Sequence, residues 1–199
     1  ANSIKTVIDL RHPDEVLYAS RFSLGEPPAT LIPLSIFPAE ISMEELTTEK
    51  NKLYGPGIST ARYLHFLKGS GAQRFARGVE LIAEKDRYPV LINCTAGKDR
   101  TGILVALVMD LLGIDDHSIG AEYERSNDGI EALIEYHESI GRRPQGTLED
   151  IRLQMETPAK HILGFLEEIR TRYGSVKEMM TSNGVSAKSL ESLRELLLD

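Results

Sequence analysis

The pattern of apolar residues changes abruptly around residue 94, and this change limits the possible folds more than any other feature of the sequence. Residues 88–93 (Tyr-Pro-Val-Leu-Ile-Asn) form a short apolar run of the type that is buried in a parallel sheet. Residues 101–112 are apolar nearly all round, which is typical of a helix at the centre of a core, and Gly113 suits its C-terminal cap. A buried strand that leads within a few residues into a buried helix indicates an α/β domain.

The rest of the chain predicts strands near the N-terminus followed mainly by helices. Residues 5–10 and 29–36 are the other strand candidates, and Pro33 makes the second of them an edge or irregular strand. Thr157 is the expected N-cap of a helix in which Pro158 is the first helical residue. Apolar spacing and turn residues predict helices over 43–53, 59–67, 73–85, 118–126, 129–139, 147–155 and 157–173, two short helices up to 198, and a turn at 55–57.

The size and charge of the chain exclude several classes of protein. With 199 residues and no repeat, low-complexity run or linker, the chain fits one domain over residues 1–199. We expect an α/β fold with a small, mainly parallel central sheet wrapped by helices, and a helical C-terminal half. A net charge of −7 argues against nucleic-acid and anionic-membrane partners, which need a basic face. The longest apolar stretch, 103–112, contains Asp110 and is too short to cross a bilayer, so we expect no stable membrane insertion.

Cysteine and histidine usage favours a protein without disulfides, metal or other cofactors. Cys94 is the only cysteine, so it cannot form an internal disulfide, which suits a reducing compartment. We therefore expect a cytoplasmic protein, or a secreted one if an export signal preceded Ala1. The five histidines show no metal-ligand spacing.

Residues 93–102 (Asn-Cys-Thr-Ala-Gly-Lys-Asp-Arg-Thr-Gly) join the predicted strand to the predicted helix and carry the chemistry of the chain. Such a junction presents the free backbone N–H groups of a helix N-terminus, which attract an anion. Gly97 allows the loop to curl so that successive N–H groups point inward. Cys94 and Arg100 bracket the loop, a spacing that can place a thiolate at the base of the cradle and a guanidinium at its rim. The guanidinium matches two phosphate oxygens, and the positive surroundings favour the nucleophilic thiolate.

This loop resembles the Cys-x5-Arg-Ser/Thr signature loop of the protein tyrosine phosphatase superfamily. The in-loop pair Lys98-Asp99 is most similar to the atypical branch of bacterial and fungal tyrosine phosphatases, related to dual-specificity and phosphoinositide phosphatases. Val7-Ile8-Asp9-Leu10-Arg11 resembles the N-terminal strand of that branch, and Glu122-Tyr123 with Ser126-Asn127 resembles a helix after its signature loop. The resemblance implies a tyrosine-phosphatase-like fold and hydrolysis of phosphate monoesters through a cysteinyl-phosphate intermediate.

In such an enzyme the catalytic residues are Cys94 as nucleophile, Arg100 as phosphate ligand, Asp99 as proton donor and Thr101 as hydrogen-bond donor to the sulfur. The expected phosphate-binding residues are Thr95, Ala96, Gly97, Lys98 and Arg100. The Lys98 side chain is expected either to be solvated or to attract a second phosphate or a lipid headgroup.

Three further residues have two interpretations each. Asp9 and Arg11 are candidate accessory residues: they form either a salt-bridged pair at the end of a strand or, by resemblance, a contact near the pocket. Tyr123 is expected to pack between helices rather than to contact substrate.

The proton donor is not fixed by the loop alone. The superfamily usually places an Asp on a separate upstream loop, but no Asp occurs between Glu15 and Lys85. We prefer Asp99, because it lies within the loop and because an in-loop Asp has this role in the atypical branch. The alternative is a glutamate acting from a mobile loop, with Glu40, Glu44 and Glu45 as the candidates. In either case we expect an acidic optimum of kcat/KM.

Asn93 departs from the superfamily pattern, which usually has His before the cysteine. An asparagine can brace the loop through hydrogen bonds but adds no positive charge. The alternative function is therefore a non-catalytic phosphate- or phosphoprotein-binding module with a weakened active site. Retention of all four predicted catalytic residues favours the enzyme. Its expected substrates are phosphotyrosine in proteins and, as further candidates, phosphoserine, phosphothreonine and phosphoinositides.

Overall fold

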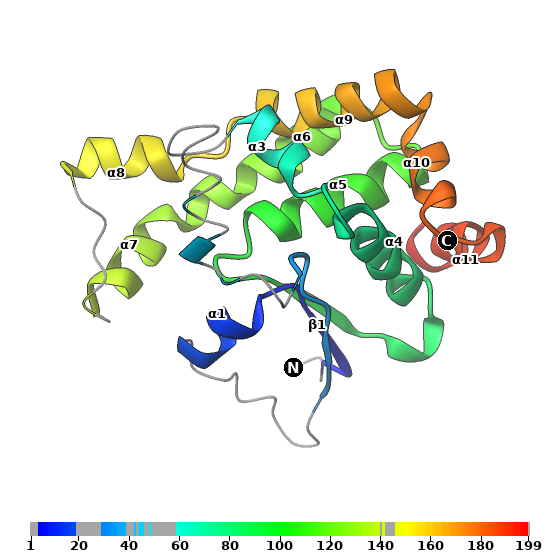
Figure 1. Ribbon diagram of the computed structural model, residues 1–199, viewed down its shortest axis with the longest axis horizontal. Coiled ribbons are helices and arrows are strands. Elements are labelled where there is room, and N and C mark those ends of the chain that lie inside the picture. The colour runs from blue at the N-terminus through cyan, green and yellow to red at the C-terminus, as the bar shows by residue number, and fades with distance from the viewer. Residues whose placement is uncertain are drawn as a thin grey trace.

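The computed structural model describes residues 4–18, 29–38, 59–139 and 146–198, together with the single positions 42, 44, 45, 48 and 141. In this part of the chain, a small sheet lies against a larger group of helices (Figure 1). The helices are α1 (Pro13–Tyr18), α3 (Thr60–His65), α4 (Gly71–Ile82), α5 (Asp99–Leu112), α6 (Asp116–Glu124), α7 (Ile130–Ser139), α8 (Leu148–Met155), α9 (Ala159–Tyr173), α10 (Val176–Ser182) and α11 (Ala187–Leu197), with 3-10 helices at Lys85–Arg87 and Arg125–Gly129.

Within the described residues, the sheet has three parallel strands in the order β2 (Thr30–Pro33), β1 (Thr6–Asp9), β3 (Val90–Asn93). All four residues of β1 are buried, because β1 lies between the other two strands. The register pairs the last residues of β1 and β3. β1 and β3 therefore end on the same side of the sheet, and β3 ends immediately before Cys94.

The predicted parallel sheet is confirmed, with one difference in β3. This strand was expected to be buried, but it lies at a sheet edge and its Leu91 is 41% exposed. An apolar run identifies a strand without showing whether a further strand pairs with it. β2 is the other edge strand, as the proline at its end requires.

Helix α5 forms the centre of the main core, as predicted. Ile103, Leu104 and Leu107 on its first turns are completely buried. α5 packs against α4, α6 and α9, and Figure 1 shows α9 on the side of α5 away from the sheet. The helix ends at Gly113, whose φ of 83° is left-handed and suits the glycine cap expected there. Residues 94–100 thus connect the carboxyl end of β3 to the N-terminus of the buried helix α5.

Helices α7 and α8 share a separate small cluster of apolar side chains. Ile130, Ile134, Ile151 and Met155 form it, with Leu133 packed against them. In Figure 1 the two helices extend to the left of the main body, opposite to α10 and α11. The predicted helical C-terminal half is therefore confirmed, but it has two cores rather than one.

Two local predictions differ from the structure. Thr157 does not cap α9: its hydroxyl donates to Asn127 at 2.9 Å, and Pro158 occupies the N-cap position. A short helix, α1, follows β1, at a place where the sequence analysis predicted no helix. The helix predicted over 43–53 and the turn at 55–57 lie outside the described residues, apart from three isolated positions. None of the described helices has the length and apolar composition needed to span a bilayer.

Candidate active site

Cys94 lies at the floor of the loop between β3 and α5. The residue is 5% exposed, whereas Thr95, Ala96 and Gly97 above it are exposed to solvent. Gly97 has a φ of 66°, a left-handed conformation that a residue with a side chain adopts only under strain. The loop therefore curls over the cysteine as the sequence predicted, with its glycine at the turn.

The backbone N–H groups of this loop remain available to a ligand. In the described part of the chain, none of the N–H groups of residues 95–101 donates to a backbone carbonyl, and the first such bond of α5 runs from Gly102 to Lys98 at 2.7 Å. No side chain caps the N-terminus of α5. A row of free donors at the positive end of a buried 14-residue helix favours an anion.

Arg100 turns back over the loop and is held by a carboxylate that the sequence did not identify. Its Nη1 and Nη2 donate to the two oxygens of Glu15, both at 2.6 Å. Nη2 also donates to the Thr95 hydroxyl at 3.2 Å, and Nη1 to the carbonyl of Leu10 at 3.2 Å. The Arg100 guanidinium lies 5.8 Å from the centre of the Phe37 ring. The two ends of the loop are thus tied together through the arginine.

Charge pairing dominates the electrostatics of this contact. Burial alone would raise the pKa of Glu15, but the hydrogen bonds and charge of Arg100 outweigh burial and lower the pKa to about 2. Burial likewise would lower the pKa of Arg100, yet Glu15 raises it overall. Both groups therefore stay ionised over the whole range in which the protein is expected to work.

Glu15 escaped the sequence analysis because its local signal has another explanation. It lies in the first turn of α1 after Pro13, where acidic residues are common, and it accepts a 2.7 Å hydrogen bond from the backbone of His12. Its partner lies 85 residues further along the chain. Only the tertiary arrangement shows that one carboxylate serves both contacts.

Asn93 connects the end of β3 to the end of β1. Its Nδ2 donates to Asp9 at 3.2 Å and to the carbonyl of Cys94 at 3.4 Å. Asp9 in turn is paired with Arg11, whose Nη2 lies 2.6 Å from the Asp9 carboxylate, and both are buried. The ion pair expected at the strand end is present. Its Asp9 carboxylate braces Asn93, the residue that precedes the cysteine.

Asp99 at the start of α5 accepts a hydrogen bond from the Tyr63 hydroxyl at 2.7 Å. Tyr63 comes from α3 and is completely buried, and its hydroxyl also contacts that of Tyr123 on α6. Three elements far apart in the sequence thus meet at the in-loop carboxylate. Tyr123 is a packing residue, as expected, with its ring perpendicular to that of Tyr63.

Comparison with known proteins identifies the family of this chain. A model of the tyrosine phosphatase family matches residues 1–199. The chain belongs to this family. It is 34% identical over 150 residues to the triple specificity protein phosphatase PtpB of Mycobacterium tuberculosis, covering 70% of this chain and 54% of PtpB. It is 26% identical over 199 residues to a tyrosine-protein phosphatase of Nostoc commune, covering 98% of this chain and 66% of that protein.

A third relative matches a shorter part of this chain. The putative tyrosine-protein phosphatase OCA1 of Yarrowia lipolytica is 38% identical over 61 residues, which is 30% of this chain and 24% of that protein. The chain spans between about half and two thirds of the length of the first two of these relatives. The resemblance drawn from the signature loop is therefore confirmed at the level of the family.

The structure differs from one of the two interpretations of Lys98 and from the expected contact of Thr101 with the sulfur. Lys98 is not solvated: its Nζ donates to the carbonyl of Met155 at the end of α8, at 2.7 Å, and burial lowers its pKa. Thr101 makes no hydrogen bond to the sulfur: its Oγ1 is buried and has no hydrogen-bond partner among the described residues. The backbone of both residues still lies where the loop meets α5.

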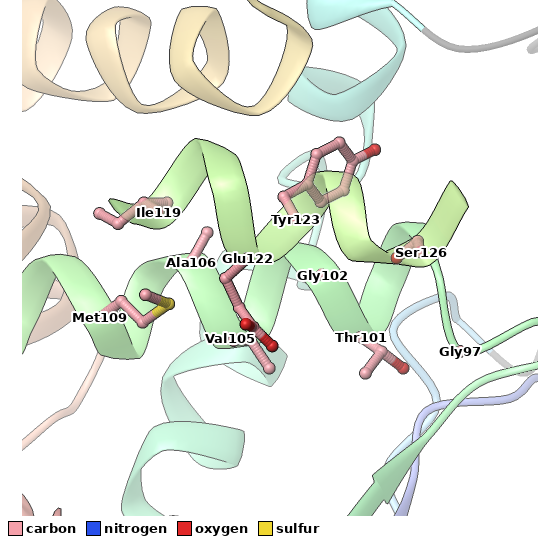
Figure 2. Close-up of a pocket in the computed structure, with 10 residues that line it drawn as sticks. All are labelled: Gly97, Thr101, Gly102, Val105, Ala106, Met109, Ile119, Glu122, Tyr123 and Ser126. Carbon is pink, nitrogen blue, oxygen red and sulfur yellow. The ribbon is translucent and has the colours of Figure 1, made fainter. Parts of the chain in front are cut away.

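A cavity of about 120 Å³ lies beside the loop, between α5 and α6. Figure 2 shows Thr101 and Gly97 at one end and Met109 and Ile119 at the other, with Glu122 reaching from α6 toward Val105. The Tyr123 ring borders this cavity while its hydroxyl points away from it. The Thr101 side chain, on the cavity side of α5, is thus placed in a space that is separate from the main core.

Two of the three alternative proton donors, Glu44 and Glu45, lie among the described residues. Glu40 lies outside the described residues, and Glu44 is exposed. Glu45 is also exposed and accepts two hydrogen bonds from Ser42, at 3.0 and 2.9 Å. Among the described residues, no group of three or more His, Cys, Asp or Glu side chains has an arrangement that could hold a metal ion.

Proposed function

We propose that this chain hydrolyses phosphate monoesters through a cysteinyl-phosphate intermediate, as a single catalytic domain over residues 1–199. The observation that carries the proposal is the position of Cys94 beneath a loop of unpaired backbone N–H groups, with Arg100 folded back over the same loop. A thiolate nucleophile and a phosphate site are thereby combined in one short turn.

The arginine offers one of its two forks to the phosphate. Glu15 occupies the end-on fork of Nη1 and Nη2, and within the described chain Nε makes no hydrogen bond. Nε–H and the second Nη2–H, which now points to the Thr95 hydroxyl, form the side-on fork. Two phosphate oxygens fit this fork, with the N–H groups of the loop binding the others. Glu15 keeps the fork facing the loop before substrate arrives.

Two chemical steps follow from this geometry. The Cys94 sulfur attacks phosphorus while the bond to the leaving-group oxygen breaks, and Asp99 donates its proton to that oxygen. Water then attacks the phosphocysteine, Asp99 accepts a proton from it, and inorganic phosphate leaves as the thiolate is restored. Arg100 and the loop N–H groups stabilise the negative charge of the phosphoryl group in both steps.

The proposed substrates are phosphotyrosine in proteins, with phosphoserine, phosphothreonine and phosphoinositides as further candidates. The support comes from relatives whose names are tyrosine-protein phosphatase and triple specificity protein phosphatase. The exposed rim at Thr95, Ala96 and Gly97 leaves room for the bulk of a protein substrate. No metal ion or organic cofactor takes part in the proposed reaction.

A second candidate is a phosphate-binding module without turnover. Asn93 in place of histidine and the missing contact from Thr101 to the sulfur favour it. Both departures affect the cysteine chemistry and leave the phosphate cradle intact. Asp99, held in the loop by Tyr63, favours the enzyme, because binding alone needs no proton donor.

Hydrolysis of an aryl phosphate in the presence of a chelator separates the two candidates. We expect the wild type to turn over, and Cys94→Ser to lose activity by roughly 10³-fold or more, because the nucleophile is gone. Inorganic phosphate should bind to both proteins. Phosphate binding without turnover by the wild type would favour the module, and equal activity of the two proteins would refute the proposed mechanism.

A further inference from the structure

Two tyrosine hydroxyl groups and one carboxyl group form a hydrogen-bonded chain beside the phosphate loop. The Tyr123 hydroxyl contacts the Tyr63 hydroxyl, which lies 2.7 Å from Oδ1 of Asp99. Tyr63 is 0% exposed and Tyr123 is 4% exposed, so solvent does not compete for these contacts. The three residues lie on α3, α5 and α6, and their meeting is a property of the tertiary fold alone.

Both tyrosines remain neutral donors at any working pH. Burial, assisted by the charge of Asp99 and by the neighbouring phenol, raises the pKa of Tyr63 far above its ordinary value. Burial also raises the pKa of Tyr123. A phenol has a single hydrogen to donate, and Tyr63 directs its hydrogen to Asp99, so Tyr123 must be the donor in the contact between the two tyrosines. Donors arranged in series in this way strengthen one another.

We propose that Tyr63 is a positioning residue that determines which oxygen of Asp99 carries the proton delivered to the leaving group. The inference rests on the proposed function, in which Asp99 is the proton donor. Oδ1 already accepts a hydrogen bond from a permanent donor, so the acidic proton resides on Oδ2. This hydrogen bond opposes rotation of the carboxyl group, which would exchange its two oxygens. Proton transfer then proceeds from a fixed atom to the leaving oxygen.

The charges around Asp99 make this control necessary. Arg62 on α3, and Lys98 and Arg100 on either side in the chain, all interact with it electrostatically. The negative phosphate group of a bound substrate opposes these cations and favours the protonated acid. Delivery of the proton then requires that the correct oxygen of Asp99 carries it.

Replacing Tyr63 by Phe isolates the hydroxyl from the packing of the ring. The Tyr63 ring lies edge-on to Tyr123 and Phe165, with centroid distances of 6.2 and 6.4 Å. Phe keeps these ring contacts and removes the donor to Asp99, together with the acceptor for the Tyr123 hydroxyl. Tyr123→Phe is the matched control, because it removes a buried hydroxyl of the same cluster that does not touch Asp99. Thermal unfolding of both variants monitors the fold.

The kinetic test compares aryl phosphates whose leaving groups differ in basicity. For Tyr63→Phe we expect kcat on phenyl phosphate to fall about tenfold with KM nearly unchanged, a fraction of what proton donors contribute. On dinitrophenyl phosphate, whose leaving group needs no proton, kcat should change less than about twofold. Tyr123→Phe should keep the leaving-group dependence of the wild type. An equal fall on both substrates would overturn the proposal.

The ¹³C signal of the Asp99 carboxyl group gives a result that does not depend on turnover. In protein labelled with ¹³C at aspartate, the Asp99 signal, identified with Asp99→Asn, should change its chemical shift in Tyr63→Phe, because Oδ1 has lost its hydrogen-bond donor. Tyr123→Phe should change it less. An unchanged Asp99 chemical shift in Tyr63→Phe would refute the link between the two residues. Absence of hydrolysis by the wild type would instead refute the proposed function.

Discussion

At the scale of single residues, the site depends on an acid that serves as a permanent counter-ion. Glu15 is paired with Arg100 through two hydrogen bonds in a largely buried position. A carboxylate whose pKa is lowered in the folded protein stabilises that state above its unfolded pKa. The stabilisation is lost as the pH falls from the ordinary value of 4.5 through the lowered value of about 2.

Replacement of Glu15 by Gln should therefore lower the free energy of unfolding in a pH-dependent way. A pKa shift from 4.5 to about 2 corresponds to roughly 3 kcal/mol at neutral pH. Denaturant unfolding of wild type and variant at a series of pH values measures the difference. The difference should be largest above pH 4.5 and shrink toward pH 2. A difference that is constant with pH would contradict the ion pair. We also expect KM for aryl phosphates to rise in Glu15→Gln, because the arginine fork loses its support.

At the scale of the elements, α5 and α6 approach closely because of one glycine. A Cβ added at Gly102 would lie 2.8 Å from Cδ2 and Cε2 of Tyr123, too close for any real contact. The absence of a side chain at this position lets the tyrosine ring rest on α5 and brings its hydroxyl to Tyr63. The close approach of α5 and α6 at Gly102 is therefore linked to the position of Asp99 through Tyr123 and Tyr63.

Gly102→Ala should destabilise the protein and disturb the tyrosine pair. We expect a loss of about 1–3 kcal/mol from overpacking, partly offset by about 1 kcal/mol of improved helix propensity. Gly129→Ala is the control, because an added Cβ there meets no atom within 4 Å. Chemical denaturation measures both. If the two substitutions changed the unfolding free energy equally, the close approach of α5 to Tyr123 would be refuted.

Most elements could be predicted from the sequence, because apolar period and turn residues are local signals. The strands around residues 6–9 and 90–93, and helix α5 with its glycine cap, are examples. The loop that contains Cys94 could be predicted for the same reason, since its residues are consecutive. The contacts of Glu15 and Tyr63 could not, because their partners lie 85 and 36 residues away in the sequence. The edge position of β3 was also beyond a local pattern.

At the scale of the whole molecule, the described chain has one large core and one small one. The large core includes Ile103 on α5, which is completely buried. The small one includes Ile134 on α7, which is 6% exposed. Lys98 connects the phosphate loop to the small cluster through the carbonyl of Met155. Because the small cluster has few buried apolar contacts, we expect it to open more readily than the main core of the described chain.

Truncating the two isoleucines should produce different kinds of instability. Ile103→Ala should cost about 2–5 kcal/mol of global stability, because it leaves a cavity in the main core. Ile134→Ala should accelerate amide hydrogen exchange in α7 and α8 while exchange in α5 changes little. Hydrogen exchange read by mass spectrometry resolves the helices. Equal acceleration in α5 and α7 of Ile134→Ala would show that the two clusters unfold as one unit.

The account as a whole requires a phosphoryl group to reside on one sulfur atom during turnover. Rapid acid quenching of the protein with an aryl phosphate, followed by peptide mass spectrometry, tests this directly. We expect one phosphoryl group on the peptide that contains Cys94, and none in Cys94→Ser. Hydrolysis by the wild type without such an adduct, or a phosphoryl group on another side chain, would contradict the central claim.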